Sequence, residues 1–421
     1  MGQAAVPAYL GSDFSAAAPG HRFNLYLPFW LAGSWAREPD KQAGKDGASP
    51  ATGKAPTLRT VVGLGAYFAG PLGLNQQLGD RQAALAAALA QQGRLLTQHA
   101  VAVAPFTTGL GNAHPLENGF AFLNPYGLPY LPGSGIKGVL RQAARELADH
   151  LWGDDQGWTH EAITALFGKT SSGTDDDSDN AAGLQRGALM FWDVLPQIAG
   201  DALQVEVMTP HQTHYYQNGE TPHESGQPNP IHFLSVPPGS KFVFHVQCDL
   251  PFLAGLSPAL AQHDRWQHLL TVALVHAFQW LGFGAKTAVG YGAMQEDEAA
   301  RQRQTLQAAA QREAAAAQAQ AQRRSSLSPA DLEAEDAQAR IAAFRSSLDT
   351  ERQLKRYKAG SAFDQQRAKL LQAALALKDP ALRRDAAQAL RESYKFTDWP
   401  GKKERKQEVK QWLTQLDGLA P

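Results

Sequence analysis

The stretch from residue 129 to residue 141 reads PYLPGSGIKGVLR, and a second stretch, from residue 281 to residue 292, reads LGFGAKTAVGYG. Each places a single lysine, Lys137 or Lys286, among glycines at the expected junction of a helix and a loop. Backbone amides that no side chain shields, beside a fixed cation, form a site for phosphate groups. The two stretches therefore predict binding of a polyanion backbone, and in this sequence context they favour RNA.

Hydrophobic periodicity around these stretches predicts an α+β fold. Helices are expected at 136–151 and at 265–281, the latter ending at Gly282 as a left-handed C-cap. An alanine-rich segment predicts a helix at 81–96. Alternating segments predict strands at 21–30, 99–105, 187–194, 204–208, 231–236 and 241–248. The order β-α-β-β-α-β with loop insertions favours a ferredoxin-like core.

The composition changes near residue 296. Residues 1–300 hold 16 Lys and Arg against 25 Asp and Glu, a net −9, and residues 301–421 hold 23 against 15, a net +8. We therefore predict a domain over 1–296, with mobile loops near 34–57 and 171–182, and a basic helical extension over 297–421. Within the extension, helices are expected at 299–322, after the Ser328-Pro329 cap and after Asp379-Pro380.

Several classes of protein are disfavoured by the sequence. A single cysteine, Cys248, excludes a disulfide framework and a CxxC zinc site. Neither a membrane-spanning apolar run nor a signal peptide is visible, so we expect a cytoplasmic protein. The acidic run at 175–179 lacks the glycine and the distal glutamate of an EF-hand, and favours a solvated loop over a metal site. No cofactor is expected.

The first stretch is expected to open its helix with free backbone amides, Ser134 being the N-cap. Three cations then follow at spacings of four on one helical face, a row that can follow a phosphate chain. A tight turn before an ordinary solvated helix face would explain the same residues, and the stretch alone does not decide. The predicted contacts are Gly133, Ser134, Gly135, Lys137, Arg141 and Arg145.

The second stretch does not match the nucleotide-binding fingerprints. A Walker A motif requires glycine directly before its Lys-Thr pair, but Ala285 stands there, and the glycine spacing does not fit a Rossmann turn. A flexible glycine loop after a helix remains, with a lysine and a threonine at its tip and a tyrosine available for stacking on bases. The predicted contacts are Gly284, Lys286, Thr287 and Tyr291.

A polar, proline-containing excursion spans residues 209–230. Histidines crowd it, but they include only one closely spaced pair and no cysteines accompany them, so we do not predict a zinc site. Two adjacent tyrosines suit stacking on bases, or else they pack the insertion. The predicted RNA contacts here are His211, Tyr215 and Tyr216.

Catalysis has weak support in the sequence. General acid–base chemistry needs a carboxylate or histidine held near a second group, and the candidates are His114, Asp193 and Glu206. Nothing in their spacing pairs them. We therefore favour a loop histidine and two strand-end carboxylates, and predict no catalytic residue.

The two stretches resemble one known family. Residues 127–141 closely resemble the G-x-PYIPGSS-x-KG-x-x-R signature of the RAMP superfamily, whose members build CRISPR effector complexes, and residues 282–292 resemble its C-terminal glycine loop. Residues 207–211, Tyr215-Tyr216 and residues 228–236 are similar to the sixth-subunit family of type III-B (Cmr) complexes. The resemblance covers about residues 100–295.

The resemblance implies a modified RRM-like domain that caps the backbone of the complex at the 3′ side of the guide RNA. The glycine loops would hold the guide, and the inserted hairpin would reach toward the guide–target duplex. The implied partners are guide RNA, target RNA and the other Cmr subunits. In the family a different backbone subunit cleaves the target, which implies that this chain is not an enzyme.

Two features depart from the family pattern, and two alternatives stay open. Phe106-Thr107-Thr108 stands where relatives often carry an Arg-Leu pair, and the helical extension exceeds the resemblance. A guide-processing endoribonuclease of the same superfamily would also carry the C-terminal glycine loop, with His114 as its first catalytic candidate, although the excursion argues against it. The basic extension could bind RNA, or it could dock on an acidic neighbouring subunit.

Overall fold

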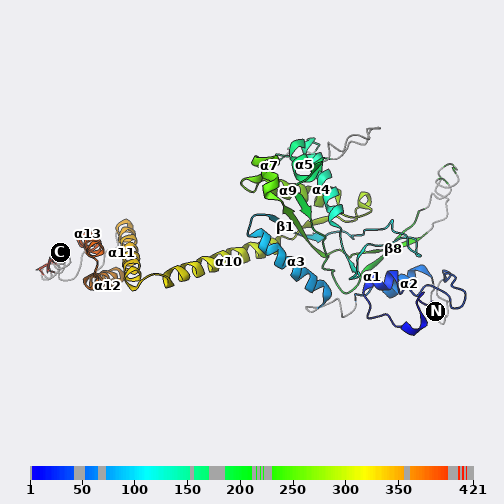
Figure 1. Cartoon of the computed structure of the whole chain (residues 1–421), viewed down its shortest axis with the longest axis horizontal. Helices are drawn as coiled ribbons and strands as arrows, with labels where there is room; N and C mark the ends of the chain where they lie inside the picture. Colours follow the sequence, from blue (N-terminus) through cyan, green and yellow to red (C-terminus); the bar gives the residue numbers. More distant parts are fainter. Residues whose placement is uncertain are drawn as a thin grey trace. The chain divides into compact units, whose positions relative to one another are not determined.

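The computed structural model describes residues 2–41, 53–64, 73–151, 156–169, 185–210, 215, 219, 221, 230–354, 361–396, 406–407, 410–411 and 414. The chain divides into two compact units, Met1–Gln304 and Thr305–Pro421 (Figure 1). The predicted loop at 171–182 and the centre of the loop at 34–57 lie outside the described residues. The predicted domain division after residue 296 stays a prediction.

The first unit is built on a four-stranded antiparallel sheet in the order β10-β1-β9-β6. Along the chain its elements follow as β1-α4-β6-β9-α9-β10, which is the ferredoxin-like order. This confirms the predicted α+β class. The bounds are β1 Leu95–Ala102, α4 Gly133–Ala148, β6 Leu189–Phe191, β9 Lys241–Cys248, α9 Arg265–His276 and β10 Met294–Glu296.

One face of this sheet carries the main core. Alternate side chains of β1 and β9, among them Ala100, Phe242 and Phe244, are buried against α4 and α9, which contribute Leu140 and Leu270. The helix α3 (Leu74–Ala90) contacts β1. Figure 1 shows α4 and α9 on one side of the sheet and α3 on the other.

Smaller elements are inserted between the core elements. The hairpin β7–β8 forms a sheet of its own, paired from Gln204 with Ser235 to Met208 with Ile231. The described bounds are η1 Ala8–Leu10, α1 Pro19–Asn24, α2 Lys54–Val61, β2 Phe122–Leu123, β3 Leu128–Pro129, α5 His160–Phe167, β4 Gly168–Lys169, β5 Gln185–Arg186, β7 Gln204–Met208, β8 Ile231–Ser235, α7 Leu250–Leu256, α8 Pro258–Ala261, η3 Ala277–Leu281 and η4 Thr287–Val289.

The predicted strand at 21–30 is wrong, because its first residues form α1. Pro19 occupies the first turn of this helix, a position where its missing amide hydrogen costs nothing. The next amide, from Gly20, donates to the carbonyl of Gly127 at 2.9 Å, and a side chain at Gly20 would collide with Phe122. A contact with a segment a hundred residues away therefore overrides the local alternation.

The predicted helix at 81–96 extends too far. The helix α3 ends at Ala90, and Gly93, with φ of 67°, turns the chain into β1. The strand consequently starts at Leu95, four residues before the predicted strand at 99–105. Gly93, which follows two glutamines, is a helix-ending signal, and the prediction from alanine content did not take it into account.

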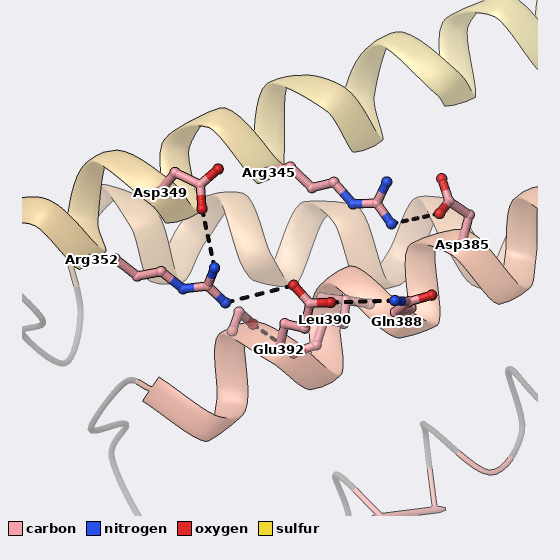
Figure 2. Close-up of polar contacts among 8 residues, drawn as sticks. Arg345, Asp349, Arg352, Asp385, Gln388, Leu390 and Glu392 are labelled. Atoms are coloured by element: carbon pink, nitrogen blue, oxygen red, sulfur yellow. Dashed lines mark hydrogen bonds and ion pairs between the residues drawn. The ribbon is translucent and has the colours of Figure 1, made fainter.

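The second unit is all-helical, as predicted. It contains the C-terminal part of α10 (Glu298–Ser325), α11 (Pro329–Leu354), α12 (Ala362–Ala376) and α13 (Pro380–Phe396). The helices α11, α12 and α13 contact one another in pairs around a core that includes Phe344, whose ring stacks on Phe363 at 5.2 Å. Figure 2 shows ion pairs from Arg345 and Arg352 on α11 to α13.

Both predicted caps of the extension are confirmed. The Ser328 hydroxyl accepts the amide hydrogen of Asp331 at 3.2 Å, and the Asp379 carboxylate accepts that of Ala381 at 2.7 Å. The helix α11 begins at Pro329 and α13 at Pro380. Within the described part of the chain, we find no helix with the length and apolar composition that a membrane span requires.

Candidate functional site

The first glycine stretch lies where β6 ends. Leu131 bridges Val194, a few residues after β6, and α4 starts at Gly133. The chain after β6 continues to Gln197, which pairs with Lys241 at the start of β9. The amino end of α4 is therefore at the end of the sheet where β6 finishes and β9 begins.

The second glycine stretch lies at this same end. The strand β1 finishes at Ala102, which pairs with Met294 at the start of β10. Just beyond β1, the carbonyls of Pro105 and Thr107 accept hydrogen bonds from Gly292 and Ala285 at 2.8 and 2.7 Å. We call this end, where β1 and β6 finish and β9 and β10 begin, the glycine end of the sheet.

The amino end of α4 is capped by a residue that is distant in sequence. The predicted N-cap, Ser134, is wrong: the N-cap position lies two residues earlier, at Pro132, and Ser134 is an exposed residue of the first helical turn. The carboxylate of Asp193 accepts the amide hydrogen of Gly133 at 2.7 Å. A side chain at Gly133 would collide with the carbonyl of Phe191, so this glycine permits the close approach of α4 to β6.

Two further glycines of α4 have no such packing reason. A Cβ at Gly135 would meet only the side chain of Leu131 at 3.7 Å, an ordinary contact, and a Cβ at Gly138 would meet nothing within 4 Å. Both residues are exposed and helical. Glycine inside a helix costs about 0.5–1 kcal/mol relative to alanine. These residues keep bare backbone at the helix surface beside Lys137, an arrangement that lets a ligand approach closely.

Lys137 has a different environment from the two arginines that follow it. It is half-buried, and among the described residues its ammonium has no hydrogen bond or ion pair. Partial burial, with a smaller effect from Arg141, lowers the pKa of Lys137. Its charge is therefore desolvated without being neutralised by a carboxylate, which favours an anionic ligand.

Arg141 is used within the fold. Its guanidinium donates to the carbonyls of Phe167 and Gly168 at 2.6 and 3.0 Å and lies 5.9 Å from the Phe167 ring. It thereby satisfies carbonyls at the carboxyl end of α5. Arg145, one turn later, is exposed. Of the three cations expected in one row, Arg141 therefore already donates to two carbonyls within the fold. The RNA contacts of Arg141 and Arg145 stay predictions.

Replacing Arg141 by alanine should lower the free energy of unfolding by about 1.5–3 kcal/mol, because two carbonyl oxygens lose a charged donor. Arg145→Ala removes the same charge from an exposed position and should change that free energy by less than about 0.5 kcal/mol. Urea denaturation of both variants and the parent measures the difference. Equal destabilisation in the two variants would contradict the capping role of Arg141.

The second glycine stretch, which we predict to be a flexible loop, is anchored by hydrogen bonds to the segment after β1. Gly284, with φ of 92°, approaches the Thr107 carbonyl so closely that a side chain would collide with it, and Gly292, with φ of 72°, does the same at Phe283. Gly282 has the predicted positive φ, 68°, but its ψ of 169° is extended. Phe106-Thr107, which stands where relatives often carry an Arg-Leu pair, therefore belongs to the segment that accepts the hydrogen bonds of this loop.

Lys286 and Tyr291 face the β7–β8 hairpin. The Lys286 ammonium lies 2.8 Å from the sulfur of Met208 and 5.2 Å from the ring centroid of Phe233. The Tyr291 hydroxyl is 3.4 Å from a carboxylate oxygen of Glu206. Partial burial and Glu206 raise the pKa of Tyr291. The lysine is thus held between the loop and the hairpin by weak partners, a thioether and a ring, which a phosphate group would outcompete.

Other predicted contacts can be placed only in part. Thr287 starts η4, a single turn that follows Lys286. Tyr215 is 44 % exposed, whereas His211 and Tyr216 lie outside the described residues. Sequence reasoning missed Met208 and Phe233 as neighbours of the lysine. The alternating sequence pattern of their two strands, β7 and β8, is visible, but it does not indicate which loop the side chains of these strands contact.

The catalytic candidates all have structural partners. One ring nitrogen of His114 lies 3.0 Å from the Phe23 carbonyl, and the other accepts the Leu116 amide hydrogen at 3.2 Å. The ring also stacks on Phe23 at 3.8 Å, and its burial lowers the pKa of His114. Asp193 caps α4 and Glu206 lies against Tyr291. Both ring nitrogens of His114 are thus engaged with backbone groups, and burial disfavours the charged form of the ring.

Comparisons with known proteins agree with the sequence motifs. Residues 99–295 match the RAMP superfamily. The CRISPR system Cmr subunit Cmr6 of Pyrococcus furiosus is 29% identical over 231 residues, which cover 45% of this chain and 64% of that protein. The chain thus spans just under two thirds of the length of this relative.

Solved structures of Cmr proteins were also matched. A chain in the cryo-EM structure of the type III-B Cmr-beta bound to cognate target RNA is 18% identical, with a TM-score of 0.38 over 53% of this chain and 66% of that one. The crystal structure of Cmr6 from Pyrococcus furiosus is 24% identical, with a TM-score of 0.26 over 48% of this chain and 97% of that one. Residues 99–295 of this chain thus match the RAMP superfamily, and the chain is similar to Cmr6, a subunit of the CRISPR Cmr system of Pyrococcus furiosus.

Proposed function

We propose that the chain is a non-catalytic, RNA-binding backbone subunit of a type III-B CRISPR effector complex that acts in antiviral defence. The observation that carries this proposal is that two glycine stretches, each with one lysine, lie at the same end of the sheet, the glycine end. They do so within residues 1–300, whose net charge is −9. Contacts of this kind to phosphates position an RNA strand without reading its bases. That property suits a subunit that must hold guides of many sequences.

We also propose a position in the complex, which the resemblance to the family supports. The chain would cap the backbone toward the 3′ side of the guide RNA, and the β7–β8 hairpin would contact the guide–target duplex. Two observations support the hairpin in this role: it forms a sheet separate from the core, and Val207 on it is 52 % exposed. The similarity to Cmr6, a subunit of the CRISPR Cmr system, supports the other Cmr subunits as partners.

The alternative function, a guide-processing endoribonuclease, has less support. It requires a histidine that can exchange a proton with the RNA, and both nitrogens of His114 are occupied by backbone groups. The purified chain should therefore bind repeat RNA and leave it intact over hours, as followed on a denaturing gel. Specific cutting that His114→Ala abolishes would establish the enzyme instead.

Purification of the tagged chain from cells that express its whole complex tests the subunit assignment. Guide RNA and the other subunits should remain with it through size exclusion at moderate salt. Recovery of the chain alone, free of RNA and of other subunits, would contradict the proposal.

A further inference from the structure

The three helices α11, α12 and α13 leave one seam open between them. Ion pairs from Arg345 to Asp385 at 2.6 Å and from Arg352 to Glu392 at 3.6 Å close the seam between α11 and α13 (Figure 2). The seam between α12 and α13 is covered by Arg367, whose guanidinium lies 4.4 Å from the ring centroid of Tyr394. The seam between α11 and α12 is hollow instead.

Two adjoining cavities, of about 390 and 320 Å³, occupy this seam. They share three lining residues, Arg340, Leu370 and Ala373, and we call them together the α11–α12 groove. The groove is hollow because small side chains such as Ala343 and Ala373 form its walls, while Phe344 lies at its floor. Its surface is mostly apolar, so the groove exposes carbon to water.

Charged side chains line both cavities of the groove, and Arg340 lines both of them. Arg340 and Lys369, both exposed, line the larger cavity. Glu333 and Asp336 line the smaller cavity, where Asp336 is already paired with Arg324 at 2.7 Å. Arg340 and Lys369 thus line the larger cavity and Glu333 lines the smaller one, and the structure shows no ion pair between any of these three and another described residue.

We propose that the α11–α12 groove binds an amphipathic helix of a neighbouring protein subunit, with an apolar ridge in the groove and carboxylates that meet Arg340 and Lys369. Small residues let helices approach closely, and a ridge of side chains from one helix fits between two others. A fourth helix at this seam would complete a bundle and remove the exposed carbon surface from water. The two cations favour a helix that carries carboxylates beside its apolar ridge.

RNA fits the groove less well than a protein helix. A phosphate chain would need several cations in a row, and the groove offers two, with Glu333 near its other end. Arginines elsewhere in the unit, including Arg323, Arg345 and Arg367, are paired with carboxylates of the unit itself. These pairs occupy individual arginines, while the net charge of +8 over residues 301–421 remains.

Site-specific photo-crosslinking in the assembled complex tests the proposal. The full chain would carry p-benzoylphenylalanine in place of Ala343, or in place of Gln388 on α13 as the control position, and would be purified with its complex. We expect a cross-link from position 343 to a protein subunit, within a segment that has apolar residues at helical spacing and flanking Asp or Glu. The control position should give at most a tenth of that yield.

A matched pair of charge reversals sharpens the test. Arg340→Glu/Lys369→Glu should reduce the cross-link from position 343 at least tenfold, whereas Arg384→Glu/Lys378→Glu, exposed cations that do not line the groove, should leave it unchanged. Three results would each overturn the proposal: cross-links to RNA, cross-links to the chain's own residues 397–421, or no yield above the control position. Circular dichroism of each variant verifies that the helices remain.

Discussion

Replacing Lys137 and Lys286 together by alanine should weaken the binding of single-stranded RNA by about 100-fold. Each lysine is expected to give one charge-assisted contact to phosphate, and a loss of about 1.4 kcal/mol per contact corresponds to tenfold in affinity. The loss should be the same for guides of different sequence, because phosphate contacts carry no base information. Fluorescence anisotropy with two unrelated RNA sequences measures both quantities.

The control for this variant removes two cations from the other end of the sheet. Arg94 precedes β1, and its carbonyl accepts the Cys248 amide hydrogen at the end of β9. Lys169 is exposed on β4, whose partner strand β5 holds Arg186 against Asp249. Arg94→Ala/Lys169→Ala makes the same charge change and should alter affinity by less than about threefold. A similar loss in both double variants would show that only net charge matters and would contradict the site.

The variant Gly135→Ala/Gly138→Ala should become more stable and yet bind RNA about tenfold more weakly. Each alanine in place of a helical glycine adds about 0.5–1 kcal/mol to the free energy of unfolding. The space around both positions accepts a methyl group, so nothing in the fold offsets that gain. The same methyl groups would hold a phosphate chain away from the backbone of α4. Urea denaturation and RNA titration on one preparation test both parts.

Gly79 offers a matched control for the expected combination of higher stability and weaker RNA binding. It lies inside α3, and a Cβ there would also meet nothing within 4 Å. Gly79→Ala should therefore raise stability by about 0.5–1 kcal/mol and leave RNA affinity unchanged. If the α4 variant keeps its full affinity as well, the bare helix surface has no binding role.

The topology of the domain could be predicted because each core element carries its own local signal. The helix after the first glycine stretch shows a clear apolar face, and the strands β8 and β9 are separated by a proline–glycine turn. The serine and aspartate caps of α11 and α13 use neighbours three and two residues away. Interactions of such short range are visible in any window of the sequence.

The details of the site could not be predicted, because they depend on partners distant in sequence. Asp193 caps α4 from a position 60 residues beyond Gly133, so a local serine was preferred in its place. Arg141 matches the spacing of a phosphate-binding row, but it donates to α5, which the sequence does not place beside α4. His114 is occupied by a carbonyl 91 residues earlier. Spacing identifies a face of a helix and leaves open what that face meets.

The salt dependence of RNA binding tests most directly whether Lys137 and Lys286 neutralise phosphates. For a single strand, the logarithm of the affinity falls with the logarithm of the salt concentration by about 0.7 for each neutralised phosphate. The slope for Lys137→Ala/Lys286→Ala should therefore be shallower than that of the parent by about 1.4, with Arg94→Ala/Lys169→Ala unchanged. Parallel slopes for the parent and the lysine double variant would contradict an RNA site at the glycine end of the sheet.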